Sequence, residues 1–165
     1  DRFYELRITE PMRLEGLGFC PTAGPFVPTF GVDKGTVHDP RARELKGVAG
    51  HAGLFGTALA VHRQLSRLSS ILKPEYYAAL YTPAQGGRTL GLDQDTSFSS
   101  ARGSYFSSLT SAGHTGFTGT SFWWDEPSGL HVVFFASRLH PDNRGEVKEI
   151  RHRLASLVGE HFLLD

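Results

Sequence analysis

Residues 57–81 carry apolar side chains at helical spacing and predict two consecutive helices. Thr57 is suited to cap the first helix, because a threonine hydroxyl accepts hydrogen bonds from the free N–H groups of a first turn. This helix runs to about Ser69. Pro74 suits the first turn of the second helix, which runs through about Leu80. The apolar stripe of the first helix comprises Leu59, His62, Leu65 and Leu68.

Residues 113–162 predict a β-hairpin followed by a helix. Two apolar runs, at 116–125 and 130–138, are separated by the polar turn Asp125-Glu126-Pro127-Ser128-Gly129. We expect one ring of the pair Trp123-Trp124 in the core and the other half-exposed. Helical spacing returns over about 145–162. The stripe expected to face the core comprises Ile150, Leu154, Leu157, Val158 and His161, and the expected solvated face comprises Arg144, Lys148 and Arg151.

The other segments carry no long period. Residues 3–9 have the spacing of a short helix that Pro11 limits. Residues 16–56 are rich in Gly and Pro, which predicts an irregular loop region. Leu90 and Leu92 can lie on a short strand within the Gly/Ser/Thr-rich stretch 82–112. The loop residues expected to pack are Phe19, Phe26, Val27, Phe30 and Val32. Together the elements predict a single α+β domain over 1–165, an antiparallel hairpin flanked by helices.

Charge and composition exclude several classes of function. The 17 Lys and Arg residues balance the 17 Asp and Glu residues, so no net field attracts nucleic acid or an anionic membrane. No apolar run approaches the ~20 residues of a membrane span. Cys20 is the single cysteine, so no internal disulfide can form. We expect its side chain to be a small, buried or half-buried apolar group.

The segment Gly113-His-Thr-Gly-Phe-Thr-Gly-Thr120 has the composition of a ligand-binding strand. Glycines let another molecule approach the backbone closely, and the hydroxyls and the imidazole offer polar contacts. Such a strand can bind an extended ligand through main-chain hydrogen bonds. The ligand-binding candidates are His114, Thr115, Gly116 and Thr118. A Gly-rich edge strand with a solvated histidine and no ligand is the alternative interpretation.

Several segments, in order along the chain, resemble one family. The segment from Gly113 to Asp125 resembles the His-Thr-Gly strand of class-C-type β-lactamases, related esterases and D-Ala-D-Ala peptidases, the penicillin-binding-protein-like serine hydrolases. The resemblance covers most of residues 1–160 and implies a β-lactamase/transpeptidase-like fold. The other matching segments are Val37-His-Asp-Pro-Arg-Ala-Arg43, Gly47-Val-Ala-Gly-His-Ala-Gly-Leu-Phe55, Leu90-Gly-Leu-Asp93, Tyr105-Phe-Ser107 and Ala136-Ser-Arg-Leu-His-Pro141.

The resemblance implies a mechanism whose first two motifs are missing here. In that family a Ser-x-x-Lys serine is the nucleophile, and a Tyr/Ser-x-Asn loop assists proton transfer. The Lys/His-Thr-Gly strand binds the substrate carboxylate and contributes to the oxyanion hole. Ser70-Ile-Leu-Lys73 spells the first motif but ends a predicted helix, so we interpret it as a chance match. Asn143 is the only asparagine and follows Pro141 by two places, so neither Tyr-x-Asn nor Ser-x-Asn is present.

We therefore expect a partial, truncated domain with no catalytic residue. It would be a non-catalytic module, a pseudoenzyme, that binds a protein partner, a cell-wall peptide or a small carboxylate. The alternative is the C-terminal fragment of an active serine acyl hydrolase (esterase, β-lactamase or D-alanyl peptidase) whose nucleophile half is supplied elsewhere. A third interpretation is a structural or assembly module without a ligand. The family favours the cell envelope or periplasm over the cytoplasm.

Two further expectations concern partners and metals. In the family, the strand that matches 130–138 pairs on its far side with strands missing from this sequence. We expect a second copy, making a homo-oligomer, another chain or a rearranged N-terminal segment to cover that edge, because an open apolar edge promotes aggregation. His38, Asp39 and His51 do not have the spacing of a metal site. We expect neither a metal nor a cofactor.

Overall fold

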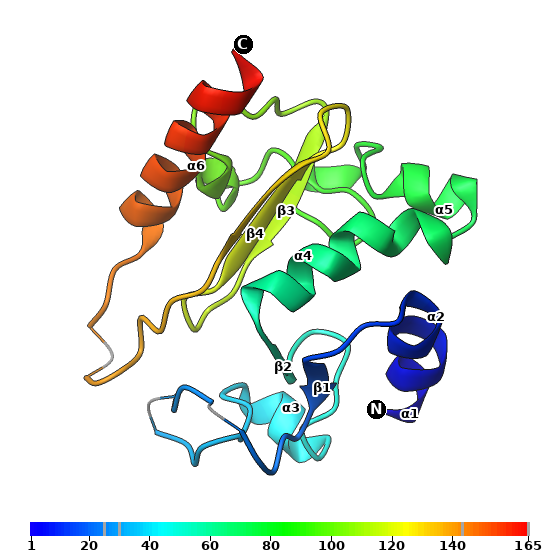
Figure 1. Ribbon diagram of the computed structural model, residues 1–165. Helices are drawn as coiled ribbons and strands as arrows, with labels where there is room; N and C mark the ends of the chain where they lie inside the picture. The colour runs from blue at the N-terminus through cyan, green and yellow to red at the C-terminus, as the bar shows by residue number, and fades with distance from the viewer. Residues whose placement is uncertain (25, 30, 143, 165) are drawn as a thin grey trace. The chain divides into compact units, whose positions relative to one another are not determined.

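A computed structural model describes residues 1–24, 26–29, 31–142 and 144–164 (Figure 1). The chain divides into two compact units, residues 1–71 with 137–145, and residues 72–136 with 146–165. Two residues of the sequence analysis, Phe30 and Asn143, lie outside the described residues. The α+β class is confirmed, with antiparallel sheets and helices. A single domain over 1–165 stays a prediction.

The first unit begins with a helical run that is longer than predicted. It comprises α1 (Arg2–Tyr4), the π-helical turn η1 (Glu5–Thr9) and α2 (Glu10–Met12). Pro11 lies in the first turn of α2 and does not limit the run, which ends at Arg13 in a left-handed backbone conformation with φ 51°. The loop region 16–56 is less irregular than expected, since β1 (Leu17–Phe19) pairs antiparallel with β2 (Leu54–Gly56) and α3 spans Pro40–Glu44.

The helix predicted from Thr57 is confirmed. It forms α4 (Ala58–Arg67) and continues into the 3₁₀ turn η2 (Leu68–Ser70). Thr57 has an extended backbone, and its hydroxyl accepts a hydrogen bond from the backbone N–H of Ala60 at 3.1 Å. The side chain therefore caps the helix as its sequence position predicts. Among the loop residues expected to pack, Phe26 packs edge-on against Phe55, with the two ring centroids 6.1 Å apart, whereas Val27 is exposed.

The second unit contains a three-stranded antiparallel sheet in the order β3-β4-β5. Its strands are β3 (Ser111–Thr115), β4 (Ser121–Asp125) and β5 (Leu130–Phe134). The predicted β4–β5 hairpin is confirmed, although its second strand ends at Phe134 and not at 138. Its turn is held by Asp125, whose carboxylate accepts hydrogen bonds from the backbone N–H and the hydroxyl of Ser128. β5 is the last strand of the sheet on its side.

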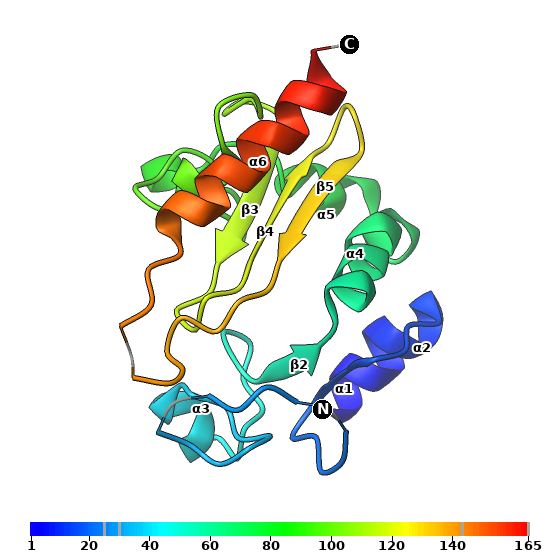
Figure 2. The same ribbon diagram turned by 60° about the vertical axis from the view of Figure 1, so that its left-hand side comes forward.

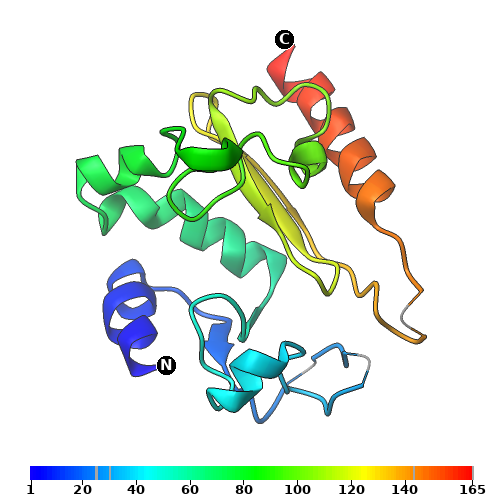
Figure 3. The same cartoon turned by 180° about the vertical axis from the view of Figure 1, so that it is seen from behind.

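The segment between α5 (Pro74–Ala79) and β3 runs beside β3 (Figure 3). It contains the short 3₁₀ turns η3 (Gln85–Gly87) and η4 (Ser99–Arg102). The sequence predicted a short strand at Leu90 and Leu92, but the structure has a turn there. This turn connects Arg88 and Asp93, which form an isolated bridge. This turn brings Asp93 against β3.

Both tryptophans of β4 are buried, which corrects the expectation that one would be half-exposed. Trp123 packs on one face with Ala101 and Phe106, and its Nε1 donates a hydrogen bond to Ser111 Oγ at 2.9 Å. Trp124 lies on the other face, with its ring centroid 4.8 Å from that of Tyr81. Neighbouring strand residues point to opposite faces, so a sheet covered on both sides buries both rings.

The helix α6 (Lys148–Leu163) runs along the sheet, in contact with η4 and β5 (Figure 2). The predicted core stripe is mostly wrong, because Ile150, Leu157 and His161 are exposed. The fully buried positions are Ala155 and Gly159. Small residues on this face let the loop beside η4 approach the helix, and a Cβ on Gly159 would lie 2.8 Å from the Tyr105 Cβ.

Candidate ligand-binding strand

The His-Thr-Gly segment is divided between a strand and a turn. His114 and Thr115 end β3, and Gly116 and Thr118 lie in the turn that leads to β4. The turn is closed by a hydrogen bond from the Gly116 N–H to the Thr120 carbonyl at 2.7 Å. The predicted strand 116–125 therefore begins only at Ser121. Of the four candidates, two belong to the strand and two to the turn.

The outer edge of β3, the side away from β4, is contacted by Asp93 and continues beyond that contact. Gly113 exchanges two backbone hydrogen bonds with Asp93, at 2.8 and 2.9 Å, so its N–H and carbonyl point away from β4. In an antiparallel ladder every second residue points the same way. The backbone N–H of Thr115 therefore also points outward, past the end of the Asp93 contact.

Gly113 is required by close backbone approach. A Cβ there would collide with the Phe122 carbonyl oxygen and the Trp123 ring, so this position keeps β3 close to β4. At Gly116 a Cβ would meet the Thr120 hydroxyl, a side-chain atom that would have to move.

His114 is half-exposed, with 46% of its side chain accessible. Its Nδ1 lies 2.9 Å from the Thr115 carbonyl oxygen. A carbonyl oxygen only accepts, so Nδ1 carries a proton in this contact. The other ring nitrogen, Nε2, lies 4.0 Å from Asp93 Oδ2. The ring therefore has a fixed orientation and remains accessible from one side.

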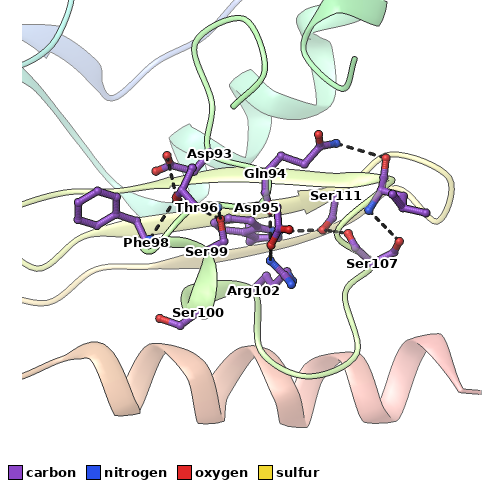
Figure 4. A network of polar contacts seen from close by, with 12 residues as sticks. Asp93, Gln94, Asp95, Thr96, Phe98, Ser99, Ser100, Arg102, Ser107 and Ser111 are labelled. Carbon is purple, nitrogen blue, oxygen red and sulfur yellow. Dashed lines mark hydrogen bonds and ion pairs between the residues drawn. The ribbon is translucent and has the colours of Figure 1, made fainter. Parts of the chain in front are cut away.

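Asp93 is a site residue that sequence reasoning missed. Its side chain is 1% exposed, and its Oδ1 contacts Arg88 Nη1 at 3.1 Å. The same oxygen accepts a hydrogen bond from Thr96 Oγ1 at 3.2 Å (Figure 4). Its Oδ2 has no hydrogen-bond partner among the described residues. In the sequence, Asp93 stands at the end of Leu90-Gly-Leu-Asp93, a segment that resembles the family but has no catalytic or ligand-binding pattern of its own.

Arg151 corrects the prediction of a solvated helix face. From α6, its Nη2 donates hydrogen bonds to the carbonyl oxygens of Gly116 at 3.0 Å and Thr120 at 2.8 Å. The side chain is half-buried. The two N–H groups of this one nitrogen bind two carbonyls of the same turn. Arg151 thus fixes the turn that follows His114.

Two other sequence features have local explanations. Ser70 ends η2, and its hydroxyl donates to the Arg67 carbonyl at 2.7 Å. The residues between Ser70 and Lys73 are not helical, so the segment lacks the alignment on one helix face that Ser-x-x-Lys chemistry requires. Cys20 is exposed, contrary to the sequence interpretation, and its Sγ donates to the Lys46 carbonyl at 3.2 Å.

His51 makes a polar contact with the residue that caps α3. His51 Nε2 lies 3.1 Å from the carboxylate of Asp39, which also caps α3 by accepting from the Ala42 N–H. The hydrogen bond from the Ala42 N–H lowers the pKa of Asp39 most, and the contact with His51 lowers it further.

Across the described ranges, no three His, Cys, Asp or Glu side chains are grouped to hold a metal. None of the described helices is long and apolar enough to cross a membrane.

Comparison with known proteins agrees with the fold. A family model described as Beta-lactamase matches residues 1–157, most of the chain. Neither the curated proteins nor the solved structures gave a match. The family match covers both strands of the confirmed hairpin and the whole His114 segment. The chain belongs to the beta-lactamase family.

Proposed function

We propose that β3 and its turn bind an extended peptide or small molecule that ends in a carboxylate, and that this chain alone does not carry out acyl transfer. The observation that carries the proposal is the outward N–H of Thr115 beside the half-exposed His114 ring. A strand edge supplies main-chain hydrogen bonds to an extended ligand, and a nearby imidazole recognises its charge.

The absence of acyl transfer is supported by the motifs. The sequence has one Ser-x-x-Lys, at Ser70, and no Tyr-x-Asn or Ser-x-Asn. The Ser70 hydroxyl is bonded to a helix carbonyl and has no helical alignment with Lys73. Covalent catalysis needs a nucleophile beside its base.

A titration calorimetry experiment tests the binding proposal. The probe is N-acetyl-D-Ala-D-Ala, with its C-terminal amide as the uncharged comparison. Thr115→Pro removes the outward N–H but no hydrogen bond to β4, and we expect it to abolish binding. Thr115→Val keeps the N–H and should retain binding. Equal affinity for the acid and the amide would contradict the proposal. Binding of the acid by Thr115→Pro as tightly as by the natural protein would also contradict it.

The second candidate is an active serine acyl hydrolase whose nucleophile half is supplied elsewhere, and membership of the beta-lactamase family favours it. Intact-mass spectrometry of the folded chain after exposure to a β-lactam and to a fluorophosphonate tests whether this chain has its own nucleophile. We expect no adduct. An adduct that maps to Ser70 would show that this chain has its own nucleophile.

We propose in addition that a second copy of this chain pairs with the outer side of β5. The support is the strand order, in which β5 ends the sheet. The last strand of a sheet presents an edge with which another strand can pair.

A further inference from the structure

The first unit contains a cleft that the proposed function does not use. Its volume is about 560 Å³, within the roughly 300–1,000 Å³ that is typical of small-molecule sites. The cleft is lined by residues of the segments 20–22, 34–37 and 43–47 and by Phe55. All of them belong to the first unit, whereas β3 belongs to the second.

The charged residues that line this cleft are all cations. They are Lys34, Arg43 and Lys46, so the cleft holds two of the four lysines of the chain. None of the three forms an ion pair within the described part of the chain. Asp33 lines an adjoining hollow that shares Arg43 with the cleft. The positive charge of the cleft is therefore in excess, although the whole chain has a net charge of zero.

Two of the cations extend from a backbone that is held in place. Arg43 lies on α3, and its Nη1 donates a hydrogen bond to the Val37 carbonyl oxygen at 3.1 Å. Lys46 follows α3 with a left-handed backbone, φ 59°, which is uncommon outside glycine. Its carbonyl oxygen accepts a hydrogen bond from Cys20 Sγ at 3.2 Å. A Cβ on Gly47 would lie 2.7 Å from the same sulfur, so these two walls of the cleft are in close contact.

The uncharged lining residues offer both hydroxyl groups and apolar surface. Thr22 and Thr36 have hydroxyls that can donate to ligand oxygens, and Pro21, Val37 and Phe55 are apolar. A phosphate monoester has about 1.5–2 negative charges at neutral pH and three acceptor oxygens. Arginine and lysine are the side chains that bind phosphate groups. Three cations thus match a phosphate better than a single carboxylate, and the volume leaves room for an organic group.

We propose that this cleft binds a small organic phosphate. The phosphate lies at Lys34, Arg43 and Lys46, and the organic group lies against the apolar lining residues. Binding of an anion relieves the repulsion among three like charges that line one cleft. The proposal is independent of the ligand proposed for β3, because the two sites share no residue.

Titration calorimetry in a phosphate-free buffer tests the proposal with phenyl phosphate as the probe. Benzoate has the same ring with one carboxylate, and benzyl alcohol has the ring without a charge. We expect phenyl phosphate to bind, benzoate to bind more weakly and benzyl alcohol not to bind. No binding of phenyl phosphate, or equal affinity for phenyl phosphate and benzoate, would overturn the proposal.

The cations are tested by substitution. Lys34→Gln and Lys46→Gln each remove one charge, and each should weaken the binding of phenyl phosphate about fivefold. Lys148→Gln is the matched control and should leave the affinity unchanged, because Lys148 is an exposed lysine of the second unit. Lys34→Gln alone serves if Lys46→Gln, at its left-handed position, does not fold. Equal affinities of Lys34→Gln, Lys148→Gln and the natural protein would overturn the proposal.

Cys20 gives a readout that depends on where the ligand binds. It lines the cleft, is exposed and is the only cysteine of the chain, so intact-mass spectrometry follows its alkylation by iodoacetamide directly. Saturating phenyl phosphate should more than halve the rate of alkylation, because the bound ligand covers the thiol. Benzyl alcohol at the same concentration should not change the rate. An unchanged rate at saturating phenyl phosphate would mean that the ligand binds elsewhere and would overturn the proposal.

Discussion

Arg151 donates a hydrogen bond from Nη2 to the backbone carbonyl oxygen of Gly116 at 3.0 Å. The contact joins the C-terminal helix α6 to the third residue of the His-Thr-Gly segment. A second bond from the same nitrogen reaches Thr120 across the turn. The shape of the turn after His114 therefore depends on a residue 35 positions later in the sequence.

We expect Arg151→Ala to lower the free energy of unfolding by about 1.5–3 kcal/mol, because it removes charge-assisted hydrogen bonds to two carbonyls. It should also speed amide hydrogen exchange at Gly116 and Gly119, whose N–H groups close the turn. Urea denaturation and hydrogen-exchange NMR measure the two effects. Arg153→Ala, on the exposed side of α6, is the control and should change neither. Equal effects of both substitutions would show that the hydrogen bonds of Arg151 to Gly116 and Thr120 do not stabilise the turn.

Thr57 gives a prediction for the first unit. Thr57→Ala removes the oxygen that accepts from the Ala60 N–H, so the free energy of unfolding should fall by about 1 kcal/mol. Thr57→Ser keeps the cap and should cost much less. Urea denaturation of the two variants checks the difference. If serine and alanine destabilise equally, the loss comes from the methyl group and not from the cap.

Tyr4 makes stability depend on pH. Burial raises its pKa from 10.0 to about 12, and its hydroxyl donates to Gln64 Oε1. The folded state thus favours the neutral phenol. The stability contributed in this way is complete below the unfolded pKa of 10.0 and is lost as the pH rises through about 12.

Tyr4→Phe has no phenol to ionise. The difference in unfolding free energy between the natural protein and Tyr4→Phe should therefore be constant below pH 10.0 and shrink as the pH rises from there toward 12. Urea denaturation at several pH values measures it, and phenolate absorbance of the natural protein minus that of the variant gives the titration of Tyr4 directly. A constant difference across this range would mean that Tyr4 ionises equally in both states.

The β5 edge predicts self-association. By the alternation of the ladder, the N–H of Val133 points away from β4, whereas its neighbours Val132 and Phe134 bond to β4. Val133→Pro should block pairing on the outer side and leave the β4–β5 hairpin intact. We expect sedimentation velocity to show a concentration-dependent dimer for the natural protein and a monomer for the variant. A natural protein that stays monomeric at all concentrations contradicts pairing between copies.

Local chemistry made part of the fold predictable. The cap at Thr57, the proline at the start of α5 and the turn between β4 and β5 each depend on residues within a few positions. Their geometry follows from hydroxyl capping and from turn residues, so a short window of sequence contains the information.

The site could be predicted only in part, because its partners are distant in sequence. His114 and Thr115 were identified from the Gly-rich segment, but Asp93 lies 21 residues earlier and Arg151 lies on another element. Periodicity also predicted the wrong core stripe for α6, since its fully buried positions are Ala155 and Gly159, with Leu163 packed against the core cluster. The close approach of the neighbouring loop determines which face of α6 is buried, and the hydrophobicity of the helix residues alone does not predict that face.

Binding of a carboxylate ligand by β3 is tested by an NMR titration of the natural protein with N-acetyl-D-Ala-D-Ala, followed on the backbone amides. We expect the largest shifts on Thr115 and its neighbours from Gly113 to Phe117, and much smaller shifts with the C-terminal amide of the same peptide. Shifts confined to other parts of the chain, or none at saturating peptide, would contradict the assignment of β3 as a ligand-binding strand.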